Sequence, residues 1–203
     1  METIILASSS VQRQEYLRLL GLPFEVIPSR MEEIFDDGVE PGLAVKKLAI
    51  QKVCNVRHLC RDRKIPWIIG ADTIILLDGQ IYGKATDRAH ARYVLSKLQG
   101  RSHEVITAIV LYNGRKKTMD CRSVISTVEF AKMEEAEIDW YLDTGEWEGA
   151  AGSYKIQGLA ACFIRGIQGS FSSVVGLPLR EFYAMLRDNG YPYGWRNSAV
   201  RPA

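Results

Sequence analysis

The chain lacks several features that would assign it to a specialised class of protein. Its four cysteines are scattered, without a Cys-x-x-Cys pair or histidines at zinc spacing, which argues against a structural zinc site. No apolar run is long enough for a signal peptide or a membrane span. Lysine and arginine number 26 against 24 acidic residues, and no long basic run occurs, so nothing favours binding to nucleic acid or to an anionic membrane. We therefore expect a cytoplasmic protein whose anionic ligand, if any, is small.

Several familiar catalytic motifs are also missing. The chain has no Gly-x-Ser-x-Gly elbow, no His-Glu-x-x-His, no phosphate-binding Gly-x-x-x-x-Gly-Lys loop and no Gly-x-Gly-x-x-Gly fingerprint. None of the three histidines stands in a pattern that indicates a general base. Any catalytic chemistry must therefore come from other residues.

Helical and strand patterns alternate along the 203 residues, which suffice to bury a core without disulfides. The dipeptides Asp78-Gly79 and Asn113-Gly114 favour tight hairpin turns. These patterns predict an α/β fold with a mixed, twisted sheet flanked by helices, in two lobes with a central cleft. We expect helices over residues 13–20, 43–60, 87–98, 133–142 and 179–189, and strands over 3–7, 24–27, 67–71, 73–77, 80–82, 103–112 and 118–128. Residues 150–178 should form strands and loops that line a site, within one domain of residues 1–189 followed by a loose C-terminal tail of residues 190–203.

Residues 4–13 predict an anion-binding loop. An apolar run breaks into three serines, Ser8 to Ser10, and a short helix follows that opens with Gln12 and Arg13. Serine hydroxyls and free amides at a helix N-terminus can donate to phosphate oxygens. A cation in the first turn opposes the helix dipole unless an anion lies nearby, so Arg13 is oddly placed for stability alone. The alternative is an arginine on the surface that caps nothing.

Other charged residues also interrupt apolar patterns. Lys52 lies on the apolar stripe of its helix, where it meets an anion or only snorkels at the stripe's edge. Asp72 follows a buried strand, either at a strand end where α/β folds place their chemistry or as a turn aspartate. Lys84 follows a glycine and could be merely solvated, and Glu33 belongs to an acidic loop that could bind Mg²⁺ or Mn²⁺ or be wet surface. Together these residues fit metal-assisted phosphate chemistry.

Five motifs occur in order along the chain: Leu6-Ala7-Ser8-Ser9-Ser10 running to Arg13, Gly70-Ala71-Asp72-Thr73, Gly83-Lys84, Tyr154-Lys155-Ile156-Gln157-Gly158 and Val174-Val175-Gly176-Leu177-Pro178. In order and spacing they resemble those of the Maf family of nucleoside triphosphate pyrophosphatases over about residues 3–188. The resemblance implies a mixed α/β fold related to that of the inosine triphosphate pyrophosphatases. It also implies a cytoplasmic homodimer that hydrolyses a nucleoside triphosphate to the monophosphate and pyrophosphate with a divalent cation, Mg²⁺ or Mn²⁺.

The resemblance carries roles to individual residues. Asp72 matches the catalytic acid/base and Glu33 a carboxylate of the acidic loop, and both would hold the metal. Lys52 and Lys84 match two catalytic lysines that face the phosphates. Thr73 and Gln157 match positions associated with base choice, and their neighbours look like those of the subgroup that acts on dTTP and UTP. Gln157 could instead be a loop amide that satisfies backbone groups. The substrate's phosphates would be bound by Ser8, Ser10, Gln12 and Arg13.

The chain departs from the family pattern at two positions. Gln12 stands where the family usually has arginine, and loss of that charge-assisted bond, roughly 1.5 to 3 kcal/mol, would weaken binding by about one to two orders of magnitude. Ala85 follows Lys84 in place of proline, which predicts a looser loop. Two other functions remain open: a non-catalytic nucleotide-binding regulator of cell division and septum formation, and a phosphatase that releases orthophosphate.

Overall fold

The computed structural model describes residues 1–31 and 38–193. Within these ranges seven strands form one sheet in the order β2-β1-β3-β5-β6-β7, and β4 pairs with β3 beside this path. β1 pairs in parallel with β2 and β3, whereas the other pairs are antiparallel, so the predicted mixed sheet is confirmed. The strands are β1 (Ile4–Leu6), β2 (Phe24–Val26), β3 (Trp67–Leu77), β4 (Gln80–Tyr82), β5 (Ser102–Asn113), β6 (Thr118–Phe130) and β7 (Ile164–Gln168).

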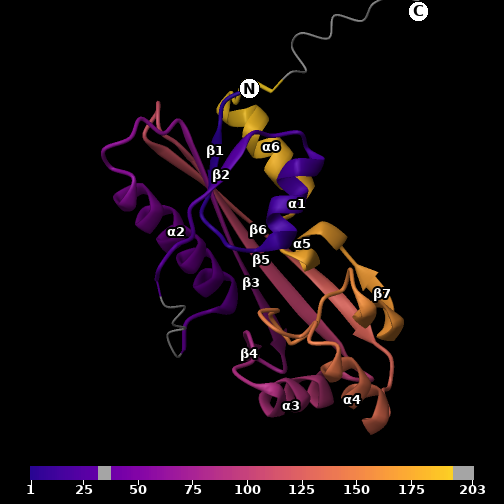
Figure 1. The fold of residues 1–203 in the computed structure, drawn as a ribbon. Coiled ribbons are helices and arrows are strands. Elements are labelled where there is room, and N and C mark those ends of the chain that lie inside the picture. Colours follow the sequence, from indigo (N-terminus) through magenta and orange to yellow (C-terminus); the bar gives the residue numbers. More distant parts are fainter. Residues whose placement is uncertain (32–37, 194–203) are drawn as a thin grey trace, which may run out of the picture.

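Helices flank the sheet in two groups, and the long strands β3, β5 and β6 run through both groups, as Figure 1 shows. At one end of the sheet, α2 (Pro41–Leu59) packs on one face. The opposite face at that end carries α1 (Val11–Leu19), α5 (Phe171–Val175) and α6 (Leu179–Asn189). The other end is covered by α3 (Arg88–Leu98), α4 (Glu135–Asp143) and the 3₁₀ helix η1 (Leu159–Phe163). The expected two-lobed arrangement is confirmed. No helix of the described residues has the length and apolarity needed to cross a membrane.

Side chains of β3 alternate between two apolar cores. Ile69 and Ala71 pack with Leu17 of α1 and with α6, whereas Ile68 and Ile74 pack with α2. Since successive residues of a strand point to opposite faces, residues 67, 69, 71 and 73 share the face of α1 and α6, and residues 68, 70, 72 and 74 share the face of α2. Two neighbouring residues of β3 can therefore meet helices on opposite sides of the sheet.

The expected break between two strands at Asp72 is wrong. β3 is one strand of 11 residues, because β5 pairs with it continuously through the register Asp72 with Ala108. On its other edge, β1 pairs with residues 67–69 and β4 with residues 75–77. Within the described part of the chain no strand pairs with residues 70–74 at that edge. Asp72 thus lies in mid-strand, beside a gap in the sheet.

The two predicted hairpins have different turns. Leu77 pairs with Gln80, so Asp78 and Gly79 form the expected two-residue turn. The second turn is a four-residue loop of residues 114–117, in which the Asn113 side-chain oxygen accepts from two backbone amides. Gly114 is needed there for a close approach, because a Cβ would lie 2.1 Å from the carbonyl oxygen of Ile65.

Most helix boundaries fall within two residues of the expected ones. α1 begins at Val11, two residues before the predicted start, so Gln12 and Arg13 lie in its first turn. The segment of residues 150–178 contains η1, β7 and α5, of which the short helix α5 was not predicted. Beyond α6, Tyr191 is buried against Trp67 with ring centroids 5.4 Å apart, so the packed chain extends past Gly190.

Candidate functional site

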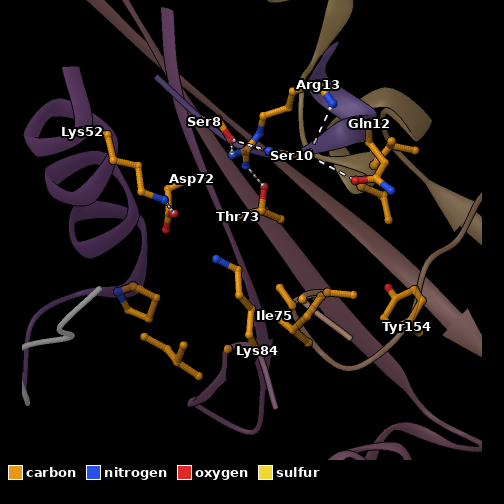
Figure 2. Close-up of a pocket in the computed structure, with 18 of the residues that line it drawn as sticks. Ser8, Ser10, Gln12, Arg13, Lys52, Asp72, Thr73, Ile75, Lys84 and Tyr154 are labelled. Carbon is orange, nitrogen blue, oxygen red and sulfur yellow. Dashed lines mark hydrogen bonds and ion pairs between the residues drawn. The ribbon is translucent and has the colours of Figure 1, made fainter. Parts of the chain in front are cut away.

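A cavity of about 1300 Å³ lies beside the gap in the sheet and is lined from both lobes (Figure 2). Its wall includes residues from the N-terminal loop, α1, α2, β3 and the segments after β4 and α4. Nine of the ten predicted site residues line it, and the tenth, Glu33, lies outside the described residues. The nine are Ser8, Ser10, Gln12, Arg13, Lys52, Asp72, Thr73, Lys84 and Gln157.

Lys52 and Asp72 form a buried ion pair on the α2 face of β3, with 11% and 6% of their side chains exposed. α2 can approach this face closely because Gly70 has no side chain: a Cβ there would lie 2.6 Å from Cγ2 of Val53. The alternatives of a lysine at the stripe's edge and of a turn aspartate are therefore wrong. Since burying two charges costs free energy even when they pair, their position at a cavity wall indicates a function beyond stability.

Arg13 is also buried, and its guanidinium joins three segments of the chain. Its Nε donates to the carbonyl oxygen of Gly176 at 2.8 Å, Nη1 to Ser8 Oγ at 2.9 Å and Nη2 to Thr73 Oγ1 at 3.3 Å. The alternative of an arginine on the surface is wrong. The first turn of α1 holds no acidic residue, so Arg13 adds to the positive end of the helix dipole. This arrangement favours an anion in the cavity.

Ser10 and Gln12 complete the N-terminal loop. Ser10 caps α1 by accepting from the Arg13 amide at 3.4 Å, and its own hydroxyl donates to Gln12 Oε1 at 3.2 Å. With its oxygen engaged in this way, the Gln12 amide presents its NH₂ group as the donor to a ligand. Gln12 can therefore bind a phosphate oxygen, but without the charge of an arginine.

The sequence interpretation missed Lys155, a cation in the cavity wall. Residues 154–157 all line the cavity, but Tyr154 and Ile156 are buried in the core around α3 and α4, whereas Lys155 is half-buried and Gln157 is exposed. The alternation of apolar and polar residues over 154–157 was the available signal. Among the described residues the Gln157 side chain makes no hydrogen bond. No backbone group of these residues is therefore satisfied by its amide, which was the alternative interpretation.

Lys84 is exposed and extends from the segment after β4 toward the part of the cavity that holds Asp72, as Figure 2 shows. Its backbone forms a β-bridge with Ala151, and the Gly152 amide donates to the Gly83 carbonyl at 2.9 Å. Ala85 packs against the neighbouring core. We expected alanine in place of proline to loosen this loop, but these contacts hold it in place.

A buried aromatic pair supports the segment that carries Lys155 and Gln157. The Tyr154 hydroxyl and His103 Nε2 lie 2.8 Å apart, and both side chains pack on Phe130. Burial lowers the pKa of His103 to about 4 and raises the pKa of Tyr154. Both groups are therefore neutral near pH 7, and the pair anchors the cavity wall without adding charge.

The donor set for a metal is sparse within the described residues. These residues contain no group of three or more histidine, cysteine, aspartate or glutamate side chains placed to hold a metal ion. Asp72 supplies one buried carboxylate at the wall. Mg²⁺ in proteins is commonly held by one or two carboxylates and by substrate phosphates, so Asp72 fits a cation that binds together with a phosphate ligand.

Comparison with known proteins identifies the family. The family model for Maf-like protein matches residues 3–189. A dTTP/UTP pyrophosphatase of Symbiobacterium thermophilum is 40% identical over 194 residues, which cover 95% of this chain and 96% of that protein. Another, of Pelotomaculum thermopropionicum, is 39% identical over 94% of this chain and 98% of that protein. Among solved structures, the Ham1 protein of Staphylococcus aureus is 17% identical with a TM-score of 0.43 over 64% of this chain and 72% of that chain, a likeness too distant to support a conclusion. On the family match and these relatives, the chain belongs to the Maf family.

Proposed function

We propose that this Maf-family chain is a nucleoside triphosphate pyrophosphatase that converts dTTP and UTP to the monophosphate and pyrophosphate. The observation that carries the proposal is the convergence of Arg13, Lys52 and Lys84, from three separate parts of the chain, on one cavity that also holds the buried carboxylate of Asp72. Cations and a helix N-terminus are the groups that proteins use to bind phosphates. The proposal is also supported by relatives named dTTP/UTP pyrophosphatase that are about 40% identical over more than nine tenths of this chain.

The residues of the cavity have distinct roles in the proposed reaction. Asp72 accepts a proton from a water molecule, whose oxygen bonds to the α-phosphorus while the bond to the bridging oxygen breaks and pyrophosphate leaves. Lys52, Lys84 and Arg13 stabilise the negative charge that develops on the phosphoryl oxygens. Lys52 also keeps the Asp72 carboxylate in place through their ion pair. Neutral donors to the phosphate oxygens come from Ser8, Ser10 and Gln12.

A divalent cation, Mg²⁺ or Mn²⁺, belongs to the proposal. Asp72 and Glu33 would hold it, and when bound it supplies Lewis-acid stabilisation of the phosphates. Removing divalent cations with EDTA should abolish pyrophosphate release, and adding back Mg²⁺ or Mn²⁺ should restore it. Full activity in EDTA would exclude this part of the proposal.

We assign base choice to Gln157. Its amide offers both a donor and an acceptor to the carbonyl and imide edge of a pyrimidine. A Gln157→Ala variant should therefore lose the preference for UTP and dTTP over GTP. Unchanged relative rates on the three nucleotides would remove Gln157 from base selection.

The decisive test is a panel of nucleoside triphosphates scored for the released product. Wild-type protein should release pyrophosphate from dTTP and UTP, and Asp72→Asn should reduce turnover by at least about a hundredfold, as loss of a general base does. Asp62→Asn, the same change on a side chain that is 91% exposed, is the matched control and should keep full activity. Nucleotide binding without turnover in any metal would favour the regulator, and release of orthophosphate would favour the phosphatase.

The proposal includes the cytoplasmic homodimer that the family resemblance implies. A dimer should elute with twice the 22.8 kDa mass of the chain in size-exclusion chromatography with light scattering. A single species at the mass of one chain, at the concentrations used for the assay, would remove the dimer from the proposal.

A further inference from the structure

Hydroxyl groups form a chain of hydrogen bonds behind Arg13, leading away from the cavity. Thr73 Oγ1 lies 3.0 Å from Thr107 Oγ1, and Thr107 Oγ1 donates to the carbonyl oxygen of Ser173 at 2.7 Å. Thr73 and Thr107 are direct partners across β3 and β5, so their side chains meet on one face of the sheet. Thr107 and Ser173 are fully buried, whereas Thr73 lines the cavity.

The number of protons on each hydroxyl group determines which atom donates in every hydrogen bond of this series. A threonine hydroxyl has one proton to donate, and a carbonyl oxygen can only accept. Because Thr107 gives its proton to the Ser173 carbonyl, it can only accept from Thr73, which therefore gives up its own proton. Thr73 is then an acceptor on the side of the cavity, where Arg13 Nη2 donates to it (Figure 2). The donor order runs from Arg13 through Thr73 and Thr107 to the backbone of α5.

This order leaves Thr73 without a proton for a nucleobase, and Arg13 takes one of the two lone pairs of its oxygen. We propose that Thr73 and Thr107 are positioning residues, which fix the guanidinium of Arg13 toward the substrate's phosphates, and that Thr73 does not read the base. This inference rests on the proposed function and differs from the role that the family resemblance implies for Thr73. A guanidinium held in place before the ligand arrives loses less conformational freedom on binding. Positioning of Arg13 should therefore raise the affinity for phosphate groups.

Three anchors among the described residues act at three different nitrogens of Arg13. The Gly176 carbonyl holds Nε, Ser8 holds Nη1 and Thr73 holds Nη2, which together fix the plane of the guanidinium. Of these anchors, Thr73 is the one that is itself oriented by a fully buried side chain, Thr107. A change at Thr107 therefore reaches Arg13 directly through Thr73. A second route runs through the Ser173 carbonyl, which also accepts from the Gly176 amide at 3.0 Å.

Helix α5, where the series of hydroxyl groups ends, is held in place by contacts other than that with Thr107. Ser126 Oγ lies 2.7 Å from Ser173 Oγ and accepts from the Ser170 amide at 3.0 Å, so α5 has its own attachment to β6. We therefore expect Thr107→Val to fold with α5 in place. In case it does not, Thr73→Val is a second variant, because it leaves the bond from Thr107 to Ser173 intact.

The test compares nucleotides with a ligand that has no base. Thr107→Val and Thr73→Val should raise KM about tenfold, and by the same factor for UTP, dTTP and GTP, with a smaller change in kcat. Inhibition by inorganic triphosphate should weaken by the same factor. Thr107→Ser keeps the hydroxyl and should restore wild-type values. Thr127→Val, the same change on the neighbouring strand β6, is the matched control. It should leave KM for the nucleotides and inhibition by inorganic triphosphate unchanged.

A double-mutant cycle with Arg13→Ala separates positioning from a general structural effect. In the Arg13→Ala background, Thr107→Val should cause no further loss, because the residue through which it acts is gone. An altered ratio of rates among the bases, unchanged inhibition by inorganic triphosphate, or a full additional loss in that background would overturn the inference.

The two proposals fail in different ways. If the wild-type chain hydrolyses no nucleoside triphosphate, the proposed function fails, while calorimetry of inorganic triphosphate on the same variants still measures the positioning of Arg13. If wild-type turnover is normal and Thr73→Val changes only base preference, the positioning inference fails alone. If wild-type protein neither hydrolyses a nucleoside triphosphate nor binds inorganic triphosphate, both fail.

Discussion

Mild acid should destabilise the protein through His103, which supports one wall of the cavity. The side chain is 2% exposed, its Nε2 is bonded to the Tyr154 hydroxyl, and its Nδ1 has no hydrogen-bond partner among the described residues. A proton added to this ring would be buried without a compensating anion. That cost is the physical reason why burial lowers the pKa of His103 to about 4.

The effect on stability has a definite direction. Between about pH 6.5 and pH 4 the unfolded chain binds a proton at His103 that the folded chain does not, so the free energy of unfolding decreases as the pH falls through this window. A pKa lowered from 6.5 to about 4 corresponds to a total loss of about 3 kcal/mol. The loss is absent above the window and complete below it. Against the 5 to 15 kcal/mol that is typical of folded domains, about 3 kcal/mol is large.

Urea denaturation from pH 7.5 to pH 4 would measure the effect. Other groups titrate in this range, so the comparison is with His103→Gln, whose amide can still bond Tyr154 but carries no proton equilibrium. The difference in stability between wild type and this variant should shift by about 3 kcal/mol across the window. His58→Gln, on an exposed histidine at the end of α2, is the control and should show no such shift. A pH-independent difference for His103→Gln would refute the assignment.

Three further predictions concern the charged groups of the cavity. Lys52→Met should lower the free energy of unfolding by about 3 to 5 kcal/mol, because Asp72 is left buried without its cation, and adding Asp72→Asn should recover part of the loss in urea denaturation. Gly176→Ala should cost about 1 to 3 kcal/mol, since its φ of +117° is strained for alanine, and should raise KM by moving the carbonyl that holds Arg13; a wild-type KM would contradict this. Lys155→Ala should raise KM for triphosphates about tenfold without changing the melting temperature, and an unchanged KM would exclude Lys155 from phosphate binding.

Much of the candidate site could be predicted because charged residues interrupt apolar patterns. Lys52 stands on a helical stripe that must face the core, and Asp72 stands inside an apolar run, so each needs a partner. That they are each other's partner did not follow from the local patterns. It depends on how α2 crosses β3 at Gly70, a contact between segments that are distant in sequence.

Other parts of the site carry no local signal. Thr107 lies in an apolar strand, where threonine is a common residue, and its role depends on the register that pairs it with Thr73. The continuity of β3 was missed for the same reason: an aspartate disfavours a strand locally, but ladder bonds from β5 on both sides of Asp72 hold the strand extended. Local propensity was overridden by long-range pairing.

The continuity of β3 explains how two different charged centres reach one cavity. Asp72 and Thr73 are neighbours on the strand, so they face opposite sides of the sheet, where Lys52 comes from α2 and Arg13 from α1. Both side chains still reach one space, because among the described residues the edge of β3 has no strand partner between the segments paired with β1 and β4. A break at Asp72 would uncouple the two faces, and a slip of one residue against β5 would exchange them, placing the carboxylate beside Arg13 and the hydroxyl beside Lys52. The register of β3 against β5 therefore determines which residue meets which cation, and with it the division of roles that we propose between proton transfer and phosphate binding.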